Sequence, residues 1–302
     1  MSIQSEFAAK VAELIAQTKD LAPAARSRVL EMLDAARREI LGRLADIDPA
    51  SFSAAQLTEL KRSIDQAMDK FRSDATTFLE SAESHAARMG AEGVTQPLIA
   101  IGMEAIAMGH VNPTTLSIAQ GYTADLITNL SRQAAHDINS ALQRAFLGGQ
   151  SWDQIVQQIG RGLGATGRVS IFDKIGERAA GIATNEILRI HGISGQARME
   201  ELVERHPALK KIWKHIPVAR FPRLTHLIAD GQIKGVNEPF EIPVLPGAAP
   251  EELMYPRDPN GSAENTIFCH CLSLPHFDAD VLKPSAEHKA LLDKLGIAIK
   301  VA

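Results

Sequence analysis

The sequence predicts an α+β protein in which a long-helix N-terminal half precedes a smaller C-terminal domain with short strands. Up to Gly148-Gly149 the apolar residues recur at the three- and four-residue spacing of helices, without a strand signal of any length. After Trp213 the chain changes to short extended pieces separated by Pro, Gly and Asn. We therefore expect a helical domain over residues 1–149 and an α+β domain over residues 150–302.

The helices of the first domain can be placed from their apolar spacing and from their start and stop signals. Ser53 is expected to cap the longest of them, and the glycine-containing stretch 89–93 is expected to end it. Asn112-Pro113 is expected to begin the last. The predicted helices cover about residues 3–20, 23–44, 53–89, 97–108 and 112–147.

Apolar residues along the longest helix form a coiled-coil-like seam over residues 57–89. They follow one another in alternating steps of mostly three and four. This pattern is typical of an ordinary long helix in a bundle, and also of a helix that self-associates or docks on a partner helix. The seam includes Leu60, Ile64, Met68, Phe71 and Ala75.

The second domain should begin with helices. Ser151 and Gln154 read as a capping box that opens a helix ending near Gly160. The glycines at 160–167 are interpreted as a link, because a phosphate-binding loop would carry G-K-[ST] after a strand. Helices are then expected over 170–205 and 285–295.

Five short motifs between Trp213 and His276 carry a family resemblance. They read R-x-x-H, D-G-Q, F-x-I-P, Y-P-x-D-P and C-x-C, in that order. A chain with these motifs resembles the phage head-morphogenesis proteins similar to Mu protein F and the SPP1 minor capsid protein. The resemblance covers residues 150–275 at most. The residues that form its structural motif are Trp213, Arg223, His226, Asp230, Gly231, Pro256 and Asp258.

The resemblance implies a structural and interaction protein and not an enzyme. Proteins of that family are minor head components that associate with the portal or the procapsid interior and assist head assembly, DNA packaging or genome delivery. The expected partners are the portal protein and other head proteins. The expected location is the host cytoplasm during assembly and then the virion head.

An enzymatic alternative is kept open, because some proteins with this domain are fused to toxins or compared with ADP-ribosyltransferases. Such a transferase should carry a spaced E-x-E pair, whereas Glu251-Glu252 is adjacent. A metal-dependent enzyme is the other form of this alternative. We identify no catalytic residue in the sequence.

The middle of the chain is its basic part, with 12 Lys and Arg against 7 Asp and Glu in residues 151–223. Such a run next to Trp213 and Phe221 suits a surface that contacts phosphates of DNA without sequence preference. It also suits a solvated helix face followed by a strand with a core Trp. The candidate DNA-contacting residues are Arg205, Lys210, Lys211, Lys214, Arg220 and Arg223.

Cys269 and Cys271 are the strongest chemical candidates, with His226 as a metal co-ligand. Two thiolates and an imidazole suit zinc. Ligand cysteines are more often two to four residues apart, so we interpret the pair as buried structural thiols and expect no cofactor, with zinc as the alternative. His270 and His276 are further co-ligand candidates.

The N-terminus has no basic segment followed by an apolar run, so we expect no secretory signal. The longest apolar window, 97–109, contains Glu104 and is shorter than the roughly 20 residues that a bilayer span needs. We therefore expect a soluble protein without a membrane partner.

Overall fold

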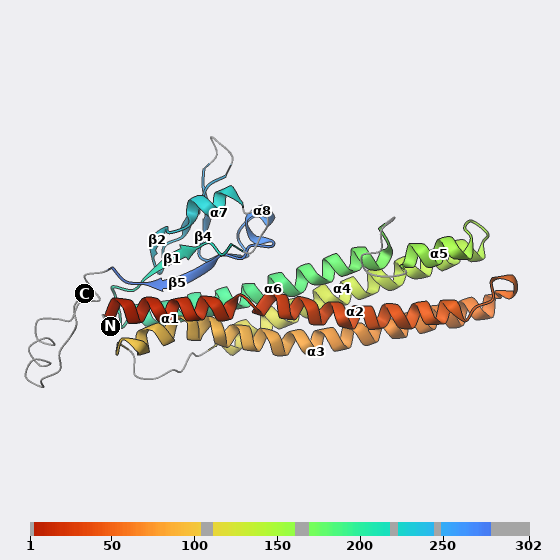
Figure 1. The fold of residues 1–302 in the computed structure, drawn as a ribbon, viewed down its shortest axis with the longest axis horizontal. Helices are drawn as coiled ribbons and strands as arrows, with labels where there is room; N and C mark the ends of the chain where they lie inside the picture. Colours follow the sequence, from red (N-terminus) through yellow and green to blue (C-terminus); the bar gives the residue numbers. More distant parts are fainter. Residues whose placement is uncertain (1–2, 104–110, 161–168, 218–222, 245–248, 279–302) are drawn as a thin grey trace, which may run out of the picture. The chain divides into compact units, whose positions relative to one another are not determined.

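The computed structural model describes residues 3–103, 111–160, 169–217, 223–244 and 249–278. It confirms the α+β class, since long helices fill the first two thirds of the chain and short antiparallel strands follow (Figure 1). The helices are α1 Ile3–Thr18, α2 Leu21–Ala45, α3 Ala54–Ala100, α4 Pro113–Phe146, α5 Trp152–Ile159, α6 Ile171–Val203, α7 Leu224–Ala229 and α8 Ala263–Thr266, with a 3-10 turn η1 at Pro49–Ser51. The strands are β1 Lys210–Lys214, β2 Ile233–Gly235, β3 Phe240–Ile242, β4 Glu251–Leu253 and β5 Leu272–His276.

The strands form two small antiparallel sheets. In the first, β1 lies between β2 and β5, with Ile212 opposite both Ile233 and Leu274. In the second, β3 pairs with β4, and Phe240 lies opposite Leu253. The F-x-I-P motif thus contains a strand, β3.

The compact units of the chain do not coincide with the predicted domains 1–149 and 150–302. Unit 1 consists of Met1–Leu21, Glu83–Leu116 and Ile187–Ala302, and unit 2 of Ala22–Ala82 and Ser117–Glu186. The expected boundary at Gly148-Gly149 falls inside unit 2. Each unit therefore draws on both halves of the sequence, because the long helices α3 and α6 contribute to both.

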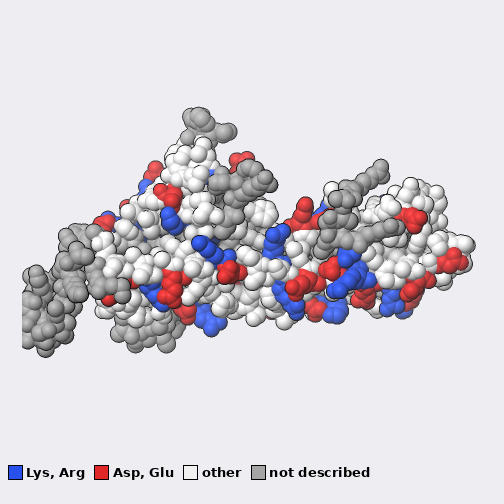
Figure 2. All heavy atoms as spheres, in the orientation of Figure 1, with Lys and Arg blue, Asp and Glu red and all other residues white. Residues whose placement is uncertain are grey.

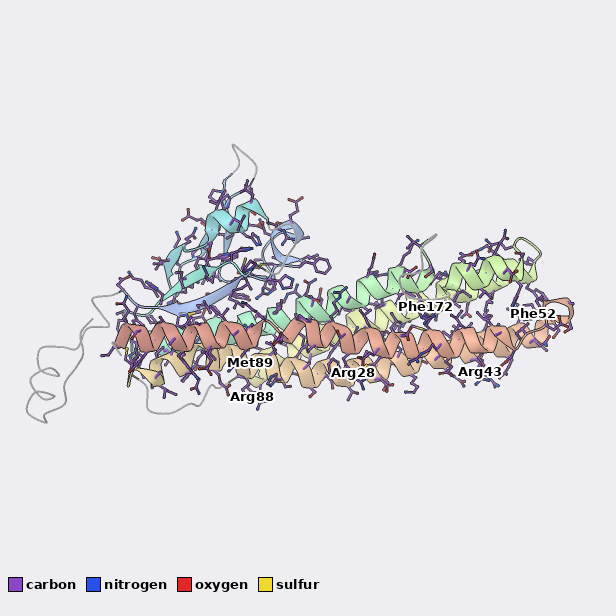
Figure 3. The ribbon with its side chains drawn as sticks, in the orientation of Figure 1. Arg28, Arg43, Phe52, Arg88, Met89 and Phe172 are labelled. Atoms are coloured by element: carbon purple, nitrogen blue, oxygen red, sulfur yellow. The ribbon has the colours of Figure 1, made fainter. Side chains whose placement is uncertain are left out.

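Unit 2 is a set of helices that bury apolar stripes. The seam residues Leu60, Ile64, Met68, Phe71 and Ala75 are buried within the chain, as a bundle helix requires. Polar bonds between helices support this packing: the Ser131 hydroxyl donates to the carbonyl oxygen of Met68 (2.7 Å), and the Asn139 amide donates to the Asp65 carboxylate (3.0 Å). Phe52, labelled in Figure 3, packs edge-on against Phe146 and Trp152.

Unit 1 joins the N-terminal helix to the C-terminal strands through one apolar cluster. The rings of Phe7 in α1 and Phe277 after β5 meet edge to face, with centroids 5.8 Å apart. This cluster is the physical reason why the strands do not form a separate domain with residues 150–186. Its buried members are Phe7, Val94, Leu98, Met199, Leu202, Leu209, Val236 and Phe277.

The prediction that α3 ends at residues 89–93 is wrong, since the helix runs past Met89 to Ala100 (Figure 3). Gly90 is needed for packing: a Cβ there would lie 2.1 Å from the carbonyl oxygen of His191 in α6. A Cβ at Gly195 would lie 3.3 Å from the carbonyl oxygen of Gly90. These glycines mark a close crossing of two helices and not a helix end. The separate helix predicted over 97–108 begins as the end of α3, and its residues 104–108 lie outside the described residues.

Three predicted helix starts are confirmed by their caps. Ser53 pairs with Gln56, and Ser151 with Gln154. In each pair the serine Oγ accepts from the glutamine backbone N–H, and the glutamine side-chain oxygen accepts from the serine backbone N–H. Asn112 Oδ1 accepts from the N–H groups of Thr114 and Thr115. The glycine link after Gly160 and the helix expected at 285–295 lie outside the described residues. Within the described part of the chain, every helix is too short or too polar to cross a membrane.

Candidate metal centre

The motif residues gather around one small apolar cluster in unit 1. Trp213 lies at its centre, with its ring 5.3 Å from that of Phe240 and 5.6 Å from that of His226. Both contacts are edge to face, which is a favoured arrangement of aromatic rings. The buried members of the cluster are Trp213, Ala229, Phe240, Ile242, Leu253, Cys269 and Cys271.

Strand β1 places its residues by simple alternation. Lys211 and Trp213 are buried, whereas Lys210, Ile212 and Lys214 are partly exposed. Lys211 therefore points into the unit, where its ammonium donates to the carbonyl oxygen of Met254 (2.8 Å) and lies over the Phe240 ring. The expectation that Lys211 contacts DNA is wrong, because this side chain has no exposed surface.

The D-G-Q motif closes the turn that returns the chain to β1. Asp230 accepts a hydrogen bond from the backbone N–H of His215 (2.8 Å) and pairs with Lys214. Gly231 has a φ of 83°, a left-handed conformation that favours glycine. The Gln232 side-chain amide then exchanges two hydrogen bonds with the backbone of Glu241. Asp230 and Gly231 are therefore structural, as predicted.

The Y-P-x-D-P motif forms a turn held by the Asp258 side chain. The Asp258 carboxylate accepts hydrogen bonds from the backbone N–H groups of Met254 (2.8 Å) and Asn260 (2.9 Å). The turn lies close to α6, since a Cβ on Gly192 would be 3.3 Å from the carbonyl oxygen of Pro256. The buried turn thus rests on a helix surface that a glycine leaves open.

Arg257 links this turn to the cysteines. Its Nη1 donates to the carbonyl oxygens of Cys269 (2.6 Å) and Cys271 (2.9 Å), and the side chain is fully buried. Burial lowers the pKa of Arg257, and the two cysteines oppose that shift. One guanidinium on both carbonyls thus fixes the backbone of the two cysteines relative to each other.

The two thiols meet two imidazoles. His226 Nδ1 lies 3.5 Å from the Sγ atoms of both Cys269 and Cys271, and these three residues are buried. The half-buried His215 adds a second ring nitrogen, with its Nδ1 3.7 Å from Cys271 Sγ. Of the co-ligand candidates, His226 is therefore in the cluster. Among the residues the structure describes, His270 and His276 are outside the three-residue donor group.

The charge state of the two thiols is strongly coupled. A hydrogen bond from Cys271 holds the pKa of Cys269 well below its usual value, against the cost of burial, and His226 and Arg257 act in the same direction. That hydrogen bond and burial raise the pKa of Cys271. The cluster thus favours a thiolate at Cys269, and the thiolate is the form of cysteine that binds metal.

Of the other predicted basic residues in the described part of the chain, Lys210, Lys214 and Arg223 have partners within it. Lys210 pairs with Asp278 (2.5 Å) and Lys214 with Asp230 (3.1 Å). Arg223 donates to the carbonyl oxygen of Ile267 (2.5 Å), and so holds the segment before the cysteines. Arg205 is exposed just after α6, and Arg220 lies outside the described residues.

Two site residues were missed from the sequence. His215 follows Lys211 and Trp213 at a spacing of two, so the alternation of β1 could have indicated it. The sequence gives no such signal for Arg257. Its role depends on the carbonyl groups that its buried guanidinium meets in the folded chain, and its backbone φ is 69°.

Fold and site together define an α+β protein whose C-terminal strands enclose a cysteine and histidine cluster. Comparison with known proteins finds a protein of Bacillus subtilis (strain 168), named "Uncharacterized protein YqbB", that is 35% identical over 119 residues. The match spans 39% of this chain and 36% of that protein. No protein-family model matches the chain, and no solved structure matches it.

Proposed function

We propose that this protein is a phage minor head protein that associates with the portal or the procapsid interior. It assists head assembly, DNA packaging or genome delivery, and it passes from the host cytoplasm to the virion head. The observation that supports this proposal is the role of the ordered motif residues. Trp213 and His226 pack in one small core, and Asp230, Gly231 and Asp258 form turns in the same unit, so the motifs mark a folded domain.

The geometry gives little support to the transferase alternative. The Glu251 carboxylate accepts hydrogen bonds from the backbone N–H and the hydroxyl of Ser262 and from the Asn265 amide. Although burial opposes the shift, these bonds lower the pKa of Glu251. A carboxylate occupied in this way fixes the start of α8 and is poorly placed to act on a substrate.

An exposed apolar patch on unit 1 offers a surface for another head protein. It consists of Leu224, Leu227 and Ile228 in α7, together with Ile267, and these side chains are between 40% and 71% exposed. Contiguous exposed apolar side chains are typical of interaction sites. The proposed partners of this patch are the portal and its neighbours in the procapsid.

The distribution of charge on the surface favours only weak contact with DNA. Over α2 and α3, Lys and Arg alternate with Asp and Glu on the face that Figure 2 shows. Many of these charges pair within one helix, as in Arg28 with Glu31 and Lys70 with Asp74. Paired charges attract phosphate less than a patch of one sign does, so any DNA contact should be weak and sensitive to salt.

The proposal is tested by locating the protein in virus particles. Virions and procapsids are purified from the phage or induced prophage that encodes the chain, and its copy number is measured against the portal protein by quantitative mass spectrometry. We expect a few copies in both particles. A second phage carries Leu224→Lys and Ile228→Lys, which change exposed residues only, and should show fewer copies per portal. Protein that is abundant in the lysate and absent from both particles would contradict the proposed function.

A further inference from the structure

We infer that Cys269, Cys271, His226 and His215 form a structural Cys2His2 site for Zn²⁺ in unit 1. The inference changes our interpretation of the cysteines from buried thiols to ligands. It rests on the four donor atoms and not on the phage assignment.

The donor separations of His226, Cys269 and Cys271 fit one tetrahedral ion, and His215 lies close enough to Cys271 to become the fourth ligand. Zinc binds Cys sulfur at about 2.3 Å and His nitrogen at about 2.0–2.1 Å, so sulfur and nitrogen in a tetrahedral site lie about 3.5 Å apart. The structure has separations of 3.5 Å from His226 Nδ1 to each sulfur and 3.7 Å from His215 Nδ1 to Cys271 Sγ. The donor atoms of His226, Cys269 and Cys271 all lie within 4.8 Å of one another. His215 is outside this three-residue group, so its ring has to turn toward the ion when the metal binds.

The one-residue spacing of the cysteines argued against a ligand pair, but both sulfur atoms lie 3.5 Å from the same imidazole nitrogen, His226 Nδ1. Because Arg257 binds both cysteine carbonyls, it fixes the backbone of the two cysteines relative to each other without a ligand turn. A metal-bound thiolate also needs polar support from its surroundings, and a buried guanidinium next to both cysteines supplies positive charge. Thiols that act only as small hydrophobic groups would not need to face two imidazole nitrogens.

With His215 as the fourth ligand, no position is left open for substrate, which is typical of a structural zinc site and not of a catalytic one. The ligands come from three places: the end of β1, helix α7 and the segment before β5. A metal would therefore hold together segments 43 to 56 residues apart in sequence. The strands here are only three to five residues long, so such a link would contribute to folding directly.

The test uses the full chain, produced in zinc-replete medium and purified without a histidine tag. Elemental analysis should find about one zinc per chain. Replacing the metal with Co²⁺ should give the sulfur-to-cobalt charge-transfer band and the intense visible bands of a tetrahedral thiolate site. The double variant Cys269→Ser and Cys271→Ser should lose both the zinc and the charge-transfer band.

The role of His215 as a ligand is tested separately with a single substitution. His215 is half-buried, so a substitution there disturbs the fold less than one at the buried ligands. Loss of a partner that only supports a ligand costs about 10–100-fold in metal affinity, so His215→Gln should weaken zinc binding at least about tenfold in a chelator competition. The matched control is His276→Gln, which changes a histidine that pairs with Asp278 outside the donor group. It should leave the affinity unchanged.

Three outcomes would overturn the inference. One is zinc far below one per chain in well-folded protein from metal-replete medium. Another is zinc that stays bound in the double cysteine variant, which would place the metal elsewhere. The third is equal zinc affinity in His215→Gln and the wild type, which would remove His215 from the site.

Discussion

A methyl group on Gly90 would lie 2.1 Å from the carbonyl oxygen of His191, so α3 and α6 approach each other here as closely as backbone atoms allow. The contact is made by backbone, which cannot rotate away as a flexible side chain can. Two nearby glycines of the same helix, Gly90 and Gly93, therefore have different roles, since a Cβ on Gly93 would meet nothing within 4 Å.

We predict that Gly90→Ala destabilises the protein. Forcing extra atoms into a packed contact costs about 1–3 kcal/mol, which exceeds the helix-propensity gain of up to about 1 kcal/mol from replacing glycine. Gly93→Ala is the matched control and should be neutral or stabilising, because only the propensity gain applies. Urea unfolding followed by circular dichroism measures both. Equal midpoints for the two variants would show that the helices do not cross at Gly90.

We predict that Lys211→Met alters how stability depends on pH. Burial lowers the pKa of Lys211 to about 8, although Glu200, Asp258 and Glu238 oppose the shift. Between about pH 8 and the unfolded-state value of 10.5, the unfolded chain binds more protons than the folded chain, so this lysine makes stability rise with pH. The rise should total about 3 kcal/mol at most.

In Lys211→Met this contribution is absent. The free energy of unfolding of the variant, relative to the wild type, should therefore fall as the pH is raised from 7 to 10. Comparing the two proteins at each pH cancels the titration of cysteines and tyrosines that they share. A difference that stays constant over this range would show that the Lys211 ammonium is solvated in the folded protein.

We predict that the protein binds duplex DNA weakly and without sequence preference, and that Lys210 and Lys214 contribute to the binding. Each phosphate contact adds about 0.9 to the slope of log affinity against log salt concentration. Replacing both lysines with Ala should reduce that slope by up to about two contacts. Fluorescence anisotropy over a salt series measures it.

The control for the DNA experiment is Lys234→Ala, a lysine on the neighbouring strand β2 that pairs with Glu241. An unchanged slope in the double variant would remove this strand as a DNA-contacting surface. Absence of binding at low salt would leave contacts with portal and head proteins as the proposed role.

Local physics was enough to place most helices and the change to strands after Trp213. Caps such as Ser53, Asn112 and Ser151 bond backbone groups within three residues of themselves, so they can be predicted from the local sequence. The alternation of β1 and the turn chemistry of Asp230-Gly231 and Asp258 are local in the same sense. The expected close association of His226 with Cys269 and Cys271 is present in the structure as well.

What the tertiary structure decided depends on pairs of residues far apart in the sequence. From the sequence, Gly90 is interpreted as a helix breaker, but in the structure it packs against His191. Lys211 is interpreted as a phosphate contact, but it lies on the same buried face of β1 as Trp213. His215 becomes a candidate ligand only when folding brings Cys271 to 3.7 Å from its ring, across 56 residues of chain. The sequence gives the spacing of residues along the backbone. Packing density, burial and the distances between donor atoms depend instead on how distant segments pack against each other in the folded protein.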